Sequence, residues 1–282
     1  MKKTLLLIFF FVLVSHSVNA NAEHPEHPEP PSVTYTVSVE DAGNREIPLD
    51  PFNMEFWGGV PGTDLLLEMQ KVVRPMGGGT IHELRVQAVH NATSIAFLLE
   101  WKDDTPDWEN LLLYADAAAV EFPSDGGEEG SAFMGDAAHM VNIWHWKADW
   151  QRNMQGGFQD TRSAFPSMFS NYSTGDLMDN VAEAVGNPNS SRIQTSPVAA
   201  FLAKGFGTLT FNSYQNVRGR GDYRDGKWRV VFLRGLETPS KIEAQFKKGV
   251  KNFAAFAVWD GKHRERNGMK SFTKNWAHLI IK

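Results

Sequence analysis

The sequence contains no cysteine among its 282 residues. This absence excludes disulfides, cysteine zinc sites, iron–sulfur clusters, a thiol nucleophile and haem attached through Cys-x-x-Cys-His. Acidic residues outnumber basic ones, 33 against 28, and the formal net charge is −5. Because a nucleic-acid-binding protein needs a basic face for the phosphate backbone, this charge argues against that class. An apolar share of 42% excludes global disorder.

Familiar catalytic motifs are also missing. The sequence has no Gly-x-Ser-x-Gly, no His-Glu-x-x-His and no dinucleotide-binding fingerprint. The three glycines at residues 77–79 lack the Lys-Ser/Thr of a phosphate-binding loop and predict a turn. His139 and His145 would lie about 20 Å apart on a straight strand and could not share one metal ion.

Long apolar runs are scarce, and the longest lies at the N-terminus. Lys2 and Lys3 precede an apolar or hydroxyl run at residues 4–14, and the small residues Ala20 and Ala22 follow it. This order is typical of a secretory signal peptide at residues 1–20, cut after Ala20 or Ala22. The run is too short for a bilayer, which needs about 20 residues. We therefore expect a periplasmic or otherwise exported protein without a membrane span.

Residues 21–32 are rich in proline and predict a tether without regular structure. We expect residues 33–282 to form one domain, in which strand signals dominate. Short strands separated by Gly, Pro and Asp turns predict a mainly β fold, an antiparallel β-sandwich with a few short helices. The expected strands cover residues 33–39, 83–90, 94–101, 117–122, 140–146, 208–214, 227–233, 253–259 and 276–281.

Helical patterns are few. Helical spacing of apolar residues predicts a helix at residues 174–185, and the pair Ser196-Pro197 predicts a short capped helix that ends near Gly205. The first of these helices lies within residues 151–196, a long and mostly polar insertion. Insertions of that size tend to be lids or partner surfaces.

Two segments stand out as candidate sites. In the aromatic segment 133–150, a strand would place Trp144 and Trp146 on one side and His145 on the other. Composition alone favours a core strand here. In segment 254–270, an apolar strand ends at Trp259, and a charged loop then leads to Lys270. Composition alone favours a solvated turn for this loop.

Together these segments resemble the haem-binding γ subunits of periplasmic molybdenum enzymes, among them ethylbenzene, dimethylsulfide, chlorate and selenate oxidoreductases and relatives among nitrate reductases and nitrite oxidoreductases. The resemblance extends in family order from about residue 35 to residue 281. It is carried by Phe-Met-Gly-Asp at 133–136, Val-Asn-Ile-Trp-His-Trp-Lys-Ala-Asp-Trp at 141–150, Glu-Trp-Lys-Asp at 100–103, Val-Glu-Phe-Pro at 120–123, Gly-Phe-Gly-Thr-Leu-Thr at 205–210, Asp-Gly-Lys-Trp-Arg-Val-Val-Phe at 225–232 and Ala-Val-Trp-Asp-Gly at 257–261.

The resemblance implies a β-sandwich with one non-covalent haem b, whose iron is held by Met134 of Met-Gly-Asp and Lys270 of Gly-Met-Lys. Where this chain has Met140, the family usually has proline, so Met140 offers a second candidate sulfur. The amine candidates that compete with Lys270 are Lys262 and Lys274, and the variable Met269 offers another thioether. Trp144, Trp146 and Trp259 either wall the haem or pack the core.

The implied ligands are chemically consistent with one another. A free lysine amine has a pKa of about 10.4 and is no ligand while protonated, but burial disfavours its charge. Ligation should therefore weaken in acid. A neutral thioether favours ferrous iron and raises the potential. Two protein ligands leave no open iron position, so the subunit would carry electrons rather than catalyse.

The resemblance also implies partners: a molybdenum-containing catalytic subunit, an iron–sulfur subunit and a soluble electron carrier. The alternative is a haem-free exported β-sandwich that binds carbohydrate on exposed tryptophan rings. Visible absorbance of haem b would support the first hypothesis, and glycan binding by a colourless protein would support the second.

Overall fold

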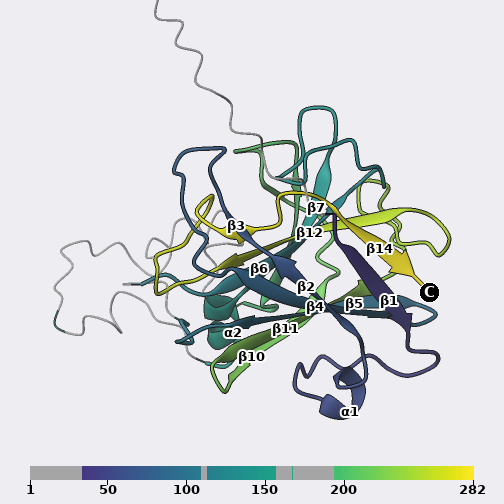
Figure 1. Ribbon diagram of the computed structural model, residues 1–282, viewed down its shortest axis with the longest axis horizontal. Coiled ribbons are helices and arrows are strands. Elements are labelled where there is room, and N and C mark those ends of the chain that lie inside the picture. The colour runs from purple at the N-terminus through teal and green to yellow at the C-terminus, as the bar shows by residue number, and fades with distance from the viewer. Residues whose placement is uncertain (1–33, 109–112, 157–166, 168–193) are drawn as a thin grey trace, which may run out of the picture. The chain divides into compact units, whose positions relative to one another are not determined.

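The computed structural model describes residues 34–108, 113–156, 167 and 194–282 (Figure 1). The predicted signal peptide, the tether, the predicted helix at 174–185 and most of the insertion lie outside these residues. The described elements are α1 (Met54–Trp57), α2 (Ala148–Met154), β1 (Thr36–Asp41), β2 (Gly62–Leu66), β3 (Glu68–Met69), β4 (Glu83–His90), β5 (Ser94–Lys102), β6 (Ala117–Pro123), β7 (Val141–Lys147), β8 (Val198–Ala203), β9 (Thr210–Phe211), β10 (Arg218–Arg224), β11 (Lys227–Gly235), β12 (Asn252–Trp259), β13 (Ser271–Phe272) and β14 (Ala277–Ile281).

The strands form two layers that share β12. In the first layer the order is β10-β11-β5-β4-β1-β14, and in the second it is β6-β7-β8-β9. The N-terminal part of β12 pairs with β14, and its later residues, from Ala255 to Trp259, pair with β6. The prediction of a mainly β sandwich is thus confirmed.

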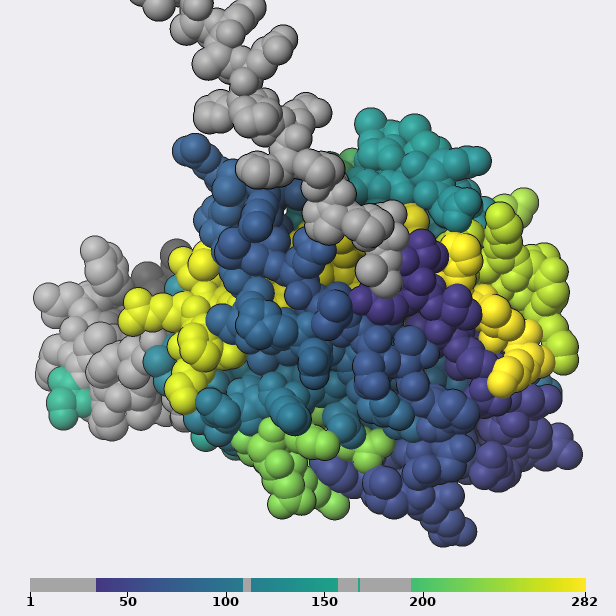
Figure 2. Space-filling view, in the orientation of Figure 1, coloured from purple at the N-terminus to yellow at the C-terminus, as the bar shows by residue number. Residues whose placement is uncertain are grey.

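One strand departs from the predicted antiparallel arrangement. β1 runs parallel to both of its neighbours, β14 and β4. Parallel neighbours need a long connection, and residues 42–82 between β1 and β4 supply one that contains α1, β2 and β3. The pairing of β1 with β14 brings the first described strand beside the last one. In Figure 2 the purple residues accordingly lie next to the yellow ones.

Large aromatic side chains fill the space between the two layers. Trp228 of the first layer contacts Trp146 of the second, with ring centroids 5.0 Å apart. Phe97 and Trp144 meet across the layers in the same way, at 6.0 Å. All four side chains are fully buried. This core therefore fixes which face of β6, β7 and β12 points away from the first layer.

The predicted short helix after Ser196 is wrong, because residues 198–203 form β8. Ser196 does cap the segment, since its hydroxyl accepts a hydrogen bond from the Val198 N–H at 3.1 Å. However, Val198, Ala200 and Phe201 are all buried, so the strand is apolar on both faces and shows no alternation. Of the strand predicted at 208–214, residues 210–211 form β9 and the others lie outside it. Within the described residues, neither helix has the length and apolar character needed to cross a bilayer.

Candidate cofactor site

A cavity of about 700 Å³ lies on the outer face of the second layer. Its floor is built from alanines: Ala117 and Ala119 of β6, and Ala255 and Ala257 of β12. Strand register places Ala257 beside Ala119, and Ala119 beside His145 of β7. Because the central side chains are small, the sheet face stays open. The volume falls within the range of about 300–1,000 Å³ that is usual for ligand and cofactor pockets.

Aromatic rings form much of the wall. Phe133 packs against Phe206 at 4.9 Å and against Phe272 at 4.7 Å between centroids. Trp259, at the end of β12, is held by a hydrogen bond from its indole N–H to the Asn267 carbonyl, 3.0 Å long. These four rings come from four separate segments. They give the cavity an apolar lining suited to a flat conjugated ligand.

Met134 enters the cavity from a tight turn that follows β6. Its backbone is left-handed, with φ of 64°, which is uncommon for a residue other than glycine. The Met134 N–H donates to both carboxylate oxygens of Glu121, at 3.0 and 3.2 Å. Its carbonyl accepts a hydrogen bond from the Gly205 N–H at 2.7 Å. The turn is therefore anchored on both sides of Met134.

Lys270 enters the same cavity from the loop between β12 and β13. The residue is only 7% exposed, and its ammonium nitrogen lies 4.7 Å from the ring centroid of Phe133 and 5.4 Å from that of Trp259. Among the described residues it forms no hydrogen bond or ion pair. Burial lowers the pKa of Lys270, while the charge of Glu121 acts in the opposite direction. The side chain is thus an amine that gives up its proton more readily than a free lysine does.

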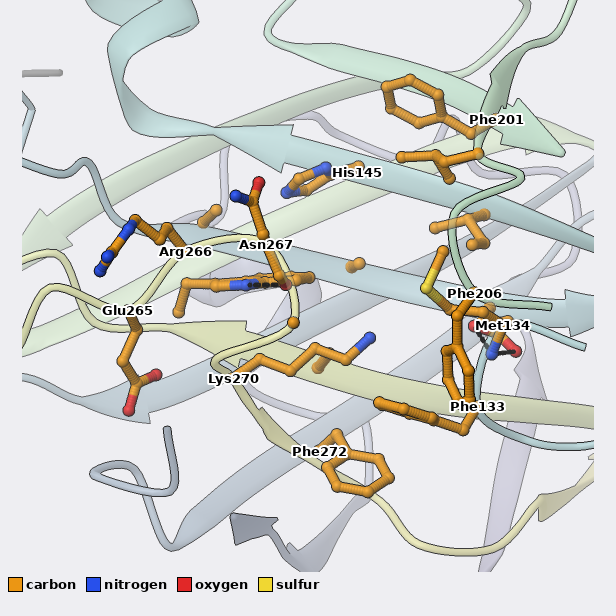
Figure 3. Close-up of a pocket in the computed structure, with 18 of the residues that line it drawn as sticks. Phe133, Met134, His145, Phe201, Phe206, Glu265, Arg266, Asn267, Lys270 and Phe272 are labelled. Atoms are coloured by element: carbon orange, nitrogen blue, oxygen red, sulfur yellow. Dashed lines mark hydrogen bonds between the residues drawn. The ribbon is translucent and has the colours of Figure 1, made fainter. Parts of the chain in front are cut away.

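The structure brings Met134 and Lys270 to one cavity, although they are 136 positions apart in the sequence. In Figure 3 the thioether and the amine point into one cavity from opposite sides. The remaining candidates lie elsewhere: Met140 and Met269 do not line the cavity, and Lys262 and Lys274 are exposed.

The three tryptophans divide between two faces. Trp259 lines the cavity. Trp144 and Trp146 do not, so of the two roles predicted for them the structure supports packing in the core and not a wall of the cavity. Both point into the core between the layers, where each is fully buried. The alternation along β7 instead turns Ile143, His145 and Lys147 towards the cavity.

Two residues of the site were missed by the sequence analysis. Burial raises the pKa of Glu121 to about 7. The positive charge of Lys270 and the hydrogen bond from the Met134 N–H lower this pKa but do not outweigh burial. Burial also lowers the pKa of His145 well below its ordinary value. The His145 Nε2 atom is buried without a hydrogen-bond partner, and its ring lies 4.8 Å from that of Trp259. The alternation along β7 could have identified His145, but nothing local marks Glu121.

Basic side chains also line the cavity. Arg74, Lys147 and Arg266 are among the lining residues, and the Arg266 guanidinium stacks over Tyr114 at 4.6 Å. The arrangement therefore combines an apolar interior, two neutral or easily neutralised metal-ligand atoms and cationic groups.

The fold and cavity thus define a β-sandwich protein with a cofactor-sized site. The family described as ethylbenzene dehydrogenase matches residues 54–271, well over half of the chain. The chain belongs to this family.

Three relatives cover most of the chain. The chlorate reductase subunit gamma of Ideonella dechloratans is 27% identical over 227 residues, 79% of this chain and 76% of that protein. A Haloferax mediterranei protein described as a respiratory nitrate reductase heme subunit is 26% identical and covers 86% of this chain and 72% of its own length. The dimethylsulfide dehydrogenase subunit gamma of Rhodovulum sulfidophilum is 26% identical, with 88% and 81% covered.

Proposed function

We propose that this protein is an electron-transfer subunit that carries one non-covalent haem b, with Met134 and Lys270 as axial ligands. The observation that carries the proposal is the convergence of these two side chains on one cavity from distant segments. Membership of the family and the names of the relatives, two gamma subunits and one heme subunit, support it.

The residues present fit a haem. A porphyrin needs an apolar slot, which Phe133, Phe272 and Trp259 provide. Its propionates need cations, and Arg74 and Arg266 line the cavity. An axial amine must be neutral, and burial lowers the pKa of Lys270 in the required direction. Because the chain has no cysteine, the haem would be held without thioether links.

The residues around the cavity suit electron transfer rather than catalysis. A bound haem supplies reversible one-electron exchange at the iron. If Met134 and Lys270 occupy both axial positions, no position remains for a substrate. The protein then has to hold the thioether and the amine in place and exclude water with its aromatic wall. These tasks require a rigid pocket, which the sheet floor provides.

We further propose the partners and the location of the protein. The family relation supports assembly with a molybdenum-containing catalytic subunit and an iron–sulfur subunit. Electrons would pass between the clusters of the iron–sulfur subunit and a soluble periplasmic carrier by way of the haem. The signal-peptide pattern at residues 1–20 supports export.

Absorption spectroscopy of the full chain, purified after expression with sufficient haem, tests the proposal. We expect a Soret band and a reduced α-band typical of haem b, with one haem per chain. Met134→Ala and Lys270→Ala should each shift the spectrum or lose haem. The matched variants Met140→Ala and Lys262→Ala should keep the wild-type spectrum, because neither side chain lines the cavity.

A colourless wild-type protein would contradict the haem, and unchanged spectra in both ligand variants would contradict the ligand assignment. Carbohydrate binding by stacked tryptophan is less well supported by the structure. Eight of the nine tryptophans are buried, and Trp108 is partly buried against the core between the layers. Sugar stacking needs exposed rings, which these side chains do not offer.

A further inference from the structure

Glu121 is a buried carboxylate at one end of the cavity floor. It lies on β6 between Ala255 of β12 and Ile143 of β7, and its side chain points to the cavity face. Its own strand neighbours on that face are Ala119 and Pro123. A charged side chain among small apolar ones is costly to bury unless it has partners.

The partner of Glu121 is the backbone of the proposed sulfur ligand. Both carboxylate oxygens accept the Met134 N–H, at 3.0 and 3.2 Å. Met134 is one of four non-glycine residues with positive φ in the described part of the chain. Such a conformation is strained and persists only where surrounding contacts determine it. The carboxylate therefore supports the conformation that directs the thioether into the cavity.

Glu121 also acts on the proposed amine ligand. Both side chains line the cavity. In keeping with this placement, the charge of Glu121 raises the pKa of Lys270, and the charge of Lys270 lowers the pKa of Glu121. One carboxylate thus binds the Met134 turn and shares the cavity with the Lys270 side chain. In the described structure, no other acidic group is linked to both.

We propose that Glu121 is a positioning residue for the iron ligands: it holds the Met134 turn by hydrogen bonding and places a negative charge beside the iron site. This inference rests on the proposed function. A negative charge near the iron stabilises the ferric state, because that state carries one more positive charge. Removing the charge should therefore raise the reduction potential.

Three variants separate the hydrogen bond from the charge. Glu121→Gln keeps an oxygen acceptor and loses the charge, so we expect retained haem, a spectrum close to wild type and a more positive midpoint potential at pH 8.5. Glu121→Asp keeps the charge but is shorter by one methylene, so its spectrum should shift towards that of Met134→Ala. Glu121→Ala should show both changes. Glu243→Gln is the matched control, because Glu243 is also buried but does not line the cavity and binds Asn212 and Asn216 instead.

A double-variant comparison distinguishes positioning from general stability. In a Met134→Ala background, Glu121→Asp should produce little further spectral change, because the ligand that it positions is already gone. Unchanged spectra and potentials in all three variants would overturn the inference while leaving the haem assignment intact. Loss of folding in all three, with haem bound by the wild type, would also overturn it. A wild type that binds no haem would instead overturn the proposed function.

Discussion

At the scale of single residues, Gly78 shows how closely the Lys270 backbone is held. Gly78 has φ of 88°, and a Cβ added there would overlap the backbone of Lys270. Only glycine combines this conformation with so close an approach. The three-glycine turn predicted from the sequence is thus the surface against which the Lys270 segment packs. It fixes the point from which the amine enters the cavity.

Lys270 should be a ligand whose binding weakens as the pH falls. Burial lowers the pKa of this amine, so the neutral form that can bind iron is available at lower pH than for a free lysine. Protonation removes the lone pair, so ligation is favoured above the effective pKa and lost below it. An acid titration followed by absorption should show a reversible change from the wild-type spectrum towards that of Lys270→Ala.

The Lys270→Ala variant is the control for this titration, because it lacks the titrating ligand and should not show the transition. The same transition in both proteins would mean that another group causes it. His145 lies in the same cavity, and its lowered pKa makes His145→Phe a useful second control.

At the scale of strands, the sequence predicts the alternation but not its orientation. Trp144 and His145 were correctly assigned to opposite sides of β7, yet nothing in the strand indicates which side faces the other layer. That choice depends on Phe97 and Trp228, which come from distant strands. Tryptophan-rich segments are therefore ambiguous between core and cofactor wall until the packing is known.

Two further elements show the limits of local patterns. Ser196 and Pro197 resemble the start of a helix, but β8 follows because its residues pair with β7 on one side and β9 on the other. No local sequence pattern distinguishes Glu121 from the other acidic residues. Its role depends on a residue 13 positions away that adopts a rare backbone conformation. The hairpin turn at Asp225-Gly226 was predictable because both residues favour positive φ.

The alanine floor should be necessary for cofactor binding. Ala119 lies at the centre of the floor, between Ala257 and His145. In Ala119→Leu, a larger side chain would project into the cavity, so we expect at least a tenfold loss of haem affinity, which is about 1.4 kcal/mol. Haem titration of the apoprotein followed by absorption measures this loss.

Ala92→Leu provides the matched control. Ala92 is exposed in the turn between β4 and β5, so the same substitution there should leave haem affinity unchanged. Far-UV circular dichroism should show that both variants keep the β fold. Wild-type affinity in Ala119→Leu would place the haem away from the alanine floor.

At the scale of the whole domain, Asp116 connects segments that are far apart in the sequence. Its carboxylate accepts hydrogen bonds from the Asp107 N–H at 2.7 Å, the Trp228 indole at 2.8 Å and the Gly261 N–H at 2.8 Å. In Asp116→Ala these buried donors would lose their acceptor, at about 1–3 kcal/mol each. We expect the free energy of unfolding in urea at about pH 4, where the advantage of the wild type is largest, to fall by about 3 kcal/mol or more.

Asp125→Ala is the control. Within the described part of the chain the Asp125 side chain binds only the exposed Gly127 N–H, so its loss should cost less than about 1 kcal/mol. The stability advantage of the wild type should also depend on pH. Burial raises the pKa of Asp116 to about 8, so the folded protein binds a proton more tightly than the unfolded chain. The advantage over Asp116→Ala should shrink as pH rises from about 4 to 8, by at most about 1.4 kcal/mol per pH unit.

The place of β14 has a consequence for folding. β14 sits between β1 and β12 in the sheet, so a strand late in the sequence fills an interior position beside the first described strand. Until β14 pairs, β1 and β12 each present an unsatisfied strand edge, and contacts between segments so distant in the sequence form slowly. Closure of this sheet should therefore be a late step of folding.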